Sequence, residues 1–201
     1  MKTEGIVLEA VSESFIGGEH AFTQSEISKR VGVAVSAVNK TINNLKRLSI
    51  VDIGRRNFRV IDFKRLLLYW ATHRNLDRDV VYSTHVDIDI GRIESSMPPD
   101  IAFTAFTAFK FIVGEPPADY SQVYVYSSAA VLGILKERFP QKKGTKNLFV
   151  LKADRYLEKK IAGNELKDSC VSLAQAFVDL WNVREWYAKE FTERLMDVLA
   201  K

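Results

Sequence analysis

The side chains best suited to recognising another molecule gather on one side of residues 35–47. On a helical wheel this segment has an aliphatic face, made of Val35, Val38, Ile42 and Leu45. The opposite face carries hydroxyl, amide and cationic groups, from Ser36, Lys40, Asn43, Asn44 and Arg47. It holds no carboxylate, whereas a merely solvated helix face usually mixes glutamate with lysine. Because asparagine can bond an adenine edge bidentately, these residue types indicate recognition of a nucleic acid.

More cations follow this segment in the stretch GRRN, residues 54–57, which has the composition of a tight turn. Residues 23–65 as a whole contain ten lysine and arginine residues against three acidic residues, whereas 66–201 are balanced. A local excess of positive charge of this kind points to an anionic partner.

The elements that position these groups can be predicted from local signals. Residues 3–16 have helical spacing and end at two glycines. Thr23 and Glu26 form a capping-box pair that starts a second helix, and Gly32 ends it. A third helix then begins at Val35, and the segments IVDI and FRVI on either side of GRRN predict two short strands.

This order of elements resembles the winged helix-turn-helix of bacterial and archaeal transcriptional regulators. The pattern SEISKRVGVAVSAVNKTINNLKRLSIV matches the helix-turn-helix, with Gly32 in the turn. The chain departs from the family at Ser49, where glycine is often found before the first wing strand, in a left-handed conformation.

The resemblance implies binding to double-stranded DNA, with the third helix in the major groove. The expected base-reading residues are Ser36, Ala37, Asn39 and Lys40. Residues nearer the DNA backbone are Asn43, Asn44 and Arg47. At the wing tip, Arg55, Arg56 and Asn57 are expected to enter the minor groove or to contact phosphates, and Arg59 and Lys29 to add phosphate contacts.

The second half of the chain has a different pattern of apolar and polar residues. Residues 62–77 predict a helix capped by Asp62 that bridges two domains, 1–62 and 78–201. Strand-like and helical stretches then alternate. The spacing of apolar residues in AFTAFTAFKFIVG fits either a strand or a helix. The C-terminal tail predicts a long amphipathic helix that is broken near Trp181 and Asn182. The expected class is α+β, an N-terminal winged helix-turn-helix with a C-terminal mixed α/β domain.

The best candidates for catalytic groups in this second half are carboxylates. Asp87 and Asp89 in VDIDIG would lie on one face of a strand, as polar positions on a half-exposed strand or as a paired-carboxylate metal site. Asp179 is expected on a helix surface or at a cap. One alternative function is therefore a nucleotidyltransferase-like or nuclease-like enzyme with a winged-helix anchor, but no catalytic, cofactor-binding or metal-binding residue is assigned.

A second resemblance covers parts of the C-terminal half. The segments FTAFTAFKFIVG, VYVY and VSLAQAFVDLWN are similar in order and spacing to the C-terminal domain of antitoxin-type regulators of type IV abortive-infection systems. Gln175, Asp179 and Leu180 match a helix of that family, Phe177 replaces its usual tyrosine, and its Thr-Gly corresponds to Thr104-Ala105 or Thr107-Ala108. The resemblance implies repression of the protein's own operon and neutralisation of a toxin encoded beside it.

The composition limits the kinds of site and the cellular location that can be expected. There is one cysteine, Cys170, and the three histidines are scattered, so the sequence predicts no disulfide, no zinc site and a reducing cytoplasmic location. No apolar run has the length of a membrane span. The function favoured is sequence-specific DNA binding in transcriptional control, with a second domain that senses, dimerises or binds a partner. A protein–protein interaction module is the remaining alternative.

Overall fold

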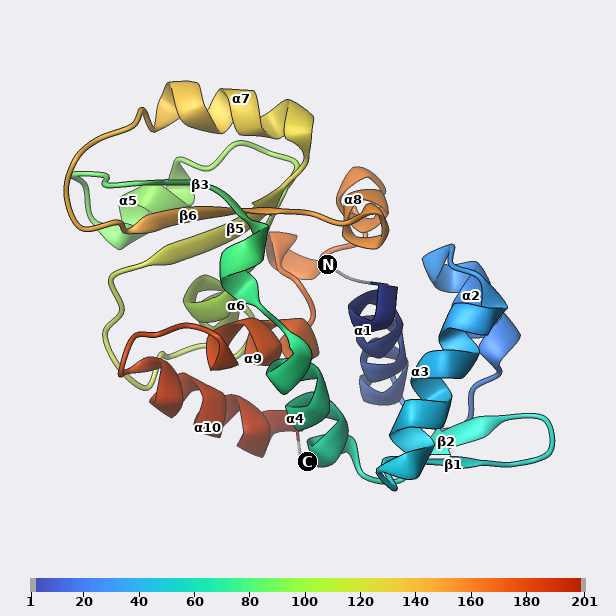
Figure 1. The fold of residues 1–201 in the computed structure, drawn as a ribbon. Helices are drawn as coiled ribbons and strands as arrows, with labels where there is room; N and C mark the ends of the chain where they lie inside the picture. Colours follow the sequence, from blue (N-terminus) through green and yellow to red (C-terminus); the bar gives the residue numbers. More distant parts are fainter. Residues whose placement is uncertain (1–2, 200–201) are drawn as a thin grey trace. The chain divides into compact units, whose positions relative to one another are not determined.

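The computed structural model describes residues 3–199, in which the chain forms two compact units of helices and strands (Figure 1). Of these residues, 3–74 and 196–199 belong to the first unit, and Asn75–Leu195 form the second. The expected α+β class is correct, because helices occur together with both antiparallel and parallel strand pairs.

Three helices form the core of the first unit: α1 (Thr3–Ile16), α2 (Gln24–Val31) and α3 (Val35–Arg47). The predicted capping box starts α2, since the Thr23 hydroxyl accepts a hydrogen bond from the Glu26 N–H at 3.1 Å and the Glu26 carboxylate accepts one from the Thr23 N–H at 2.9 Å. The Thr23 N–H, followed by its hydroxyl, lowers the pKa of Glu26. Gly32 ends α2 with a φ of 68°, a left-handed conformation that glycine adopts without strain.

A small antiparallel sheet follows α3, made of β1 (Val51–Ile53) and β2 (Phe58–Val60). The loop between them, residues 54–57, is called the basic turn below, and the Gly54 N–H closes it by donating to the Asn57 carbonyl at 2.8 Å. Phe22 pairs with Phe58 through two backbone hydrogen bonds of 2.8 Å, so the segment before α2 is fixed against β2. The two predicted strands and the turn between them are thus confirmed.

The helix after β2 is shorter than the predicted span of 62–77. Helix α4 (Phe63–His73) begins at Asp62, whose carboxylate accepts a hydrogen bond from the Arg65 N–H at 2.8 Å. Its apolar face packs on α1, and it therefore belongs to the first unit. The helix stops because Arg74 is extended, with φ −76° and ψ 140°, and the 3-10 turn η1 (Leu76–Asp79) follows.

The second unit is built on a four-stranded sheet with the order β3-β6-β5-β4. Its strands are β3 (Val80–Thr84), β4 (Ile101–Thr104), β5 (Val123–Ser127) and β6 (Leu148–Lys152). Strands β5 and β6 are parallel and are joined by α7 (Ala129–Arg138), whereas both outer strands pair antiparallel. Beside β4, the Val171 N–H donates to the Phe103 carbonyl at 2.9 Å, which covers part of that edge.

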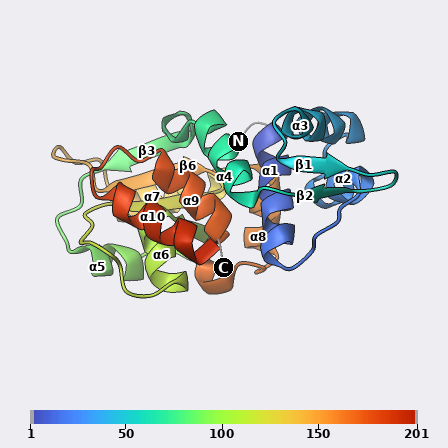
Figure 2. The ribbon, with the colours of Figure 1, turned by 90° about the horizontal axis from the view of Figure 1, so that it is seen from below.

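Helices cover both faces of this sheet. Helices α9 (Leu173–Trp181) and α10 (Ala188–Leu199) lie on one face and α7 on the other (Figures 1 and 2). The helices α5 (Ile90–Ser95), α6 (Ala105–Ile112), α8 (Arg155–Ala162) and η2 (Lys167–Ser169) complete the unit. Phe191 on α10 packs against Phe106 and Phe109 of α6, with ring centroids 4.9 and 5.1 Å apart.

Two sequence ambiguities of this half are resolved by the fold. The segment AFTAFTAFKFIVG is both strand and helix, because β4 ends at Thr104 and α6 begins at Ala105. Ala105 forms the elbow between them with a φ of 52°. The predicted break in the C-terminal helix is confirmed, since α9 ends at Trp181 and α10 begins at Ala188.

Ser49 occupies the left-handed region after α3, with a φ of 55°, and its side chain is exposed. Glycine has no Cβ penalty in this conformation. We expect Ser49→Gly to raise the free energy of unfolding by about 0.5–1 kcal/mol, as measured by denaturant titration. The matched change Ser36→Gly, within α3, should lower it by a similar amount. Equal effects of the two changes would contradict the prediction.

Candidate functional site

Apart from Val35, the exposed residues of α3 are polar, and none of them is a carboxylate. Its inner face consists of Val38, Thr41, Ile42 and Leu45, all buried in the first unit. The exposed polar residues of the helix are Ser36, Asn39, Lys40, Asn43, Lys46 and Arg47, while Ala37 and Asn44 are partly buried. The helix contains no acidic residue, so the surface predicted to bind an anionic partner is open and uniformly neutral or positive.

Val35 departs from the prediction, since it was expected on the buried aliphatic face. It is 47% exposed, because it is the first residue of α3 and precedes the turn at which the inner face begins to pack. Its neighbour Ala34 caps the helix without a side-chain hydrogen bond. The outer surface of α3 therefore begins with an apolar side chain.

A chain of amides links α2 to α3. The Asn39 side-chain amide donates to Gln24 Oε1 at 3.1 Å, and the Asn43 amide donates to Asn39 Oδ1 at 2.8 Å. These bonds set the orientation of the Asn39 amide and leave its second N–H and second lone pair for another partner. Sequence reasoning did not include Gln24, although its place directly after the Thr23 cap puts it at the start of α2.

Asn44 is less open than the other two asparagines of α3. Its side chain is partly buried and faces the Tyr69 hydroxyl on α4, which itself donates to Glu4 Oε1 at 2.8 Å. Burial, followed by the bond to Glu4, raises the pKa of Tyr69 to about 12. Asn44 therefore contributes to packing between α3 and α4, in contrast to the open side chains of Asn39 and Asn43.

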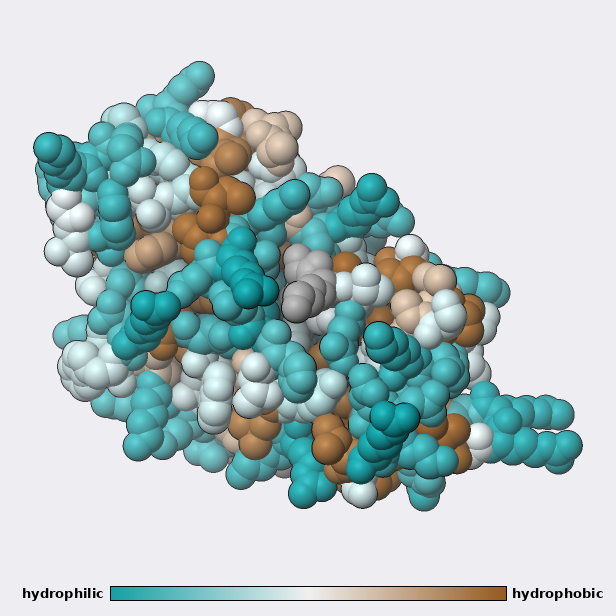
Figure 3. Space-filling view, in the orientation of Figure 1, coloured by the Kyte–Doolittle hydropathy of each residue, from teal (hydrophilic) through white to brown (hydrophobic). Residues whose placement is uncertain are grey.

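The basic turn is fully open. Arg55, Arg56 and Asn57 are exposed, and among the described residues neither arginine has an ion-pair partner. In the space-filling view, hydrophilic side chains project beyond the strands β1 and β2 (Figure 3). Together with the first residues of α2, the turn lines a cleft of about 320 Å³. A phosphate group that enters this cleft would contact both the basic turn and the start of α2.

Lys29 and Arg59, which were predicted to add phosphate contacts, have different neighbours. Lys29 is exposed on α2. Arg59 on β2 lies opposite Asp52 on β1, and its guanidinium is 3.2 Å from that carboxylate. Because both side chains are largely exposed, this pair is weak and does not prevent Arg59 from contacting another anion.

In the second unit, the expectation that Asp87 and Asp89 lie on one face of a strand is wrong. Strand β3 ends at Thr84, so both residues lie beyond it. The Asp89 carboxylate caps α5 by accepting a hydrogen bond from the Arg92 N–H at 2.9 Å. Asp87 instead pairs with His85 at 2.6 Å and with Lys142. The paired-carboxylate geometry behind the enzyme alternative is absent.

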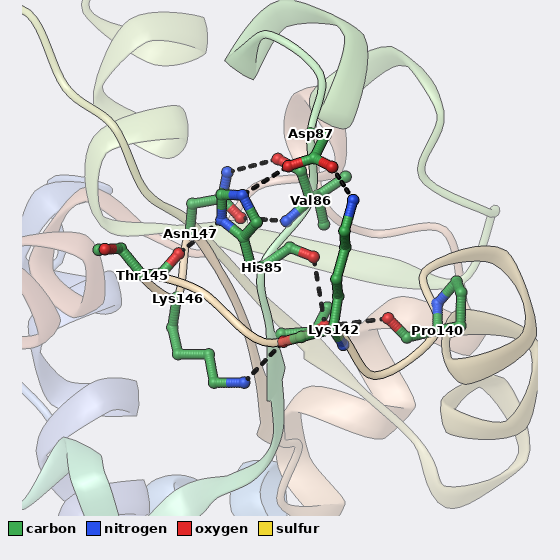
Figure 4. A network of polar contacts seen from close by, with 9 residues as sticks. His85, Val86, Asp87, Pro140, Lys142, Thr145, Lys146 and Asn147 are labelled. Carbon is green, nitrogen blue, oxygen red and sulfur yellow. Dashed lines mark hydrogen bonds and ion pairs between the residues drawn. The ribbon is translucent and has the colours of Figure 1, made fainter.

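Asp87 belongs to a polar network that ties the segment after β3 to the loop before β6 (Figure 4). His85 Nε2 faces the Asp87 carboxylate, and its Nδ1 lies 2.7 Å from the Thr145 carbonyl. The Asn147 side chain pairs with both the N–H and the carbonyl of Val86, at 2.8 Å each. Both nitrogens of the histidine ring lie within hydrogen-bonding distance of protein oxygens, so the ring is held inside this cluster, which ties the two loops together.

Asp179 is also placed differently from its prediction, which put it on a helix surface or at a cap. Its side chain is completely buried. The carboxylate oxygen Oδ2 accepts hydrogen bonds from the Thr104 hydroxyl at 2.8 Å and the Tyr126 hydroxyl at 2.7 Å. It therefore joins α9 to the ends of β4 and β5. Gln175, one turn earlier on α9, is also buried.

The remaining candidate groups in the second unit are enclosed. Cys170 is buried, and this burial, with a smaller effect of Asp168, raises the pKa of its thiol to about 12. The thiolate is therefore not populated at neutral pH. Within residues 3–199, no three histidine, cysteine or acidic side chains group as metal ligands. None of the helices described combines the length and the apolar character needed to cross a membrane.

The outer side of α3 and the basic turn thus form open polar surfaces of the first unit that carry no acidic side chain. Comparison of this chain with models of protein families, with curated proteins and with solved structures finds no match.

Proposed function

We propose that this protein binds double-stranded DNA sequence-specifically and regulates transcription, with its first unit acting as a winged helix-turn-helix. The observation that carries the proposal is the exposed, carboxylate-free face of α3 beside a basic turn without ion-pair partners. The succession α1, α2, α3, β1, β2 supports it, because it is the element order of that fold. The basic turn is then the tip of the wing.

The α3 surface suits the major groove of DNA. An α-helix fits this groove and presents its N-terminal residues to base edges. Asn39 is held by Gln24 with hydrogen-bonding capacity left over, which suits bidentate contact with adenine. Ser36 and Lys40 lie on the same side, and Arg47 follows about two turns after Lys40, in a position suited to a phosphate.

The basic turn and Lys29 supply contacts that do not depend on sequence. Each lysine or arginine that neutralises a phosphate releases a condensed counterion, and binding weakens as salt rises. Arg55 and Arg56 suit this role because they are exposed and unpaired among the described residues. A second copy of the chain on a second half-site would multiply specificity, so we include a homodimer in the proposal.

For the second unit we propose a regulatory role of the antitoxin type, in which the protein represses its own operon and binds a toxin. The geometry of Ala105 supports the resemblance on which this rests. Its φ of 52° is a conformation that favours glycine, and the related regulators have Thr-Gly where this chain has Thr104-Ala105. Ala108, the other candidate for that glycine, lies inside α6.

DNA fragments selected from the genome by the purified protein should yield a defined binding site. We expect affinity for this site to fall steeply between about 50 and 200 mM salt, as it does for proteins that contact several phosphates. The double change Arg55→Ala/Arg56→Ala should weaken binding to all sequences and reduce the slope of log affinity against log salt by about 2. Fluorescence anisotropy at several salt concentrations measures both quantities.

The control removes the same two charges from the second unit, through Lys143→Ala and Arg194→Ala, both exposed. This variant should keep the salt slope of the wild type within about 0.5. If the protein binds no duplex at low salt, a protein–protein module replaces the proposal. If it binds but both variants behave alike, the basic turn is not the wing.

A further inference from the structure

Val35 is an exposed apolar residue at the end of α3 that would enter the groove first. It is 47% exposed, and the preceding Ala34 and following Ser36 are exposed as well. Its side chain has no donor or acceptor, so it can contribute to recognition only through apolar contact. An aliphatic group in this position has one partner in the major groove, since thymine is the only base that presents a methyl group there.

The neighbours of Val35 define a row of side chains along α3. Asn39 follows four residues later and Asn43 four residues after that, so the three lie on one side of the helix. The bonds from Asn43 to Asn39 and from Asn39 to Gln24 fix the amides of this row. A second row, Ser36 and Lys40, runs beside it.

We propose that Val35 reads a thymine by contact with its C5 methyl group, while Asn39 reads an adjacent adenine. The inference rests on the proposed DNA binding and adds the class of base pair that is read. Side chains four apart on a helix are about 5–6 Å apart, and successive base pairs rise by about 3.4 Å. The thymine and the adenine therefore lie one or two base pairs from each other, in an A·T-containing core of the binding site.

The test replaces each thymine of the selected binding site in turn by deoxyuridine, which lacks only the methyl group. Wild-type protein should bind one such duplex about fourfold more weakly, the factor that corresponds to one buried methyl group. A 5-methylcytosine·guanine pair at this position should bind more tightly than the unmodified cytosine·guanine pair, because it restores the methyl group. Anisotropy at one fixed salt concentration measures these affinities.

The variant Val35→Ala should bind the thymine and deoxyuridine duplexes equally well. The matched control is Leu48→Ala, which truncates an aliphatic residue of similar exposure, 46%, just beyond the other end of α3 and should keep the discrimination. Both residues are exposed, so both variants should fold, and circular dichroism checks this.

Two results separate this inference from the function on which it rests. Specific binding with no effect of deoxyuridine at any position, or an effect that persists in Val35→Ala, overturns the role of Val35 and leaves DNA binding intact. Absence of duplex binding at low salt overturns both. Loss of discrimination in Val35→Ala alone supports the inference.

Discussion

Replacement of Asp179 by alanine should lower the free energy of unfolding of the second unit by about 3–5 kcal/mol. The carboxylate is completely buried and accepts hydrogen bonds from the hydroxyls of Thr104 and Tyr126. A buried donor left without its partner costs about 1–3 kcal/mol, and the change deprives both hydroxyls of this acceptor. Urea denaturation gives the free energy, and amide hydrogen exchange of residues 101–112 locates the loss in this unit.

The variants Thr104→Val and Tyr126→Phe measure separately the contributions of the two hydrogen bonds to Asp179. Each removes one donor, so each should destabilise less than Asp179→Ala, and both should have much smaller effects in the Asp179→Ala background. Asp119→Ala, at an exposed loop position of the same unit, is the control and should change stability by less than about 0.5 kcal/mol. Equal stabilities of the Asp179 and Asp119 variants would show that the buried network contributes nothing.

Gly144→Ala should be the second strongly destabilising change, with a loss of about 2–4 kcal/mol. Gly144 has a φ of 138°, which residues with a Cβ avoid, and an added Cβ would lie 2.8 Å from Cγ of the His85 ring. The ring cannot move away freely, because its nitrogens are bonded to the Asp87 carboxylate and the Thr145 carbonyl (Figure 4). The change therefore combines backbone strain with disruption of the loop network.

Gly133→Ala is the matched control for this prediction. Gly133 lies in the exposed surface of α7, and an added Cβ would meet nothing within 4 Å. Alanine is the better helix former, so this variant should gain up to about 1 kcal/mol. Thermal denaturation of the two variants should therefore shift in opposite directions, and shifts of the same sign would contradict the strain assigned to Gly144.

Much of the first unit could be predicted from sequence because its signals are local. The capping box of Thr23 and Glu26 spans three residues, and the stop at Gly32 depends on one backbone conformation. The left-handed conformation expected where Ser49 replaces glycine is also present. Periodicity located the inner face of α3 correctly for Val38, Ile42 and Leu45.

The same periodicity misplaced Val35, because a helical wheel assigns a direction to a side chain without telling where packing begins. Val35, the first residue of α3, is 47% exposed, whereas Val38, one turn later, is completely buried. Alternation likewise predicted one strand through Asp89, yet β3 ends at Thr84, where Asn147 bonds the Val86 backbone and diverts the chain. The contact between Asn147 and Val86, which are far apart in sequence, thus outweighs the local alternation of polar and apolar residues.

By itself, the sequence determined the order of the elements, the ends of α2, the basic turn and the absence of carboxylates from α3, since each depends on neighbours within a few residues. The tertiary structure alone decided that Asp179 is buried and that Val35 is open. The partners of Asp179 lie 75 and 53 residues away in sequence, and no local pattern encodes such contacts. Burial is a property of the packed chain, and so are the roles that burial assigns to a carboxylate or an aliphatic side chain.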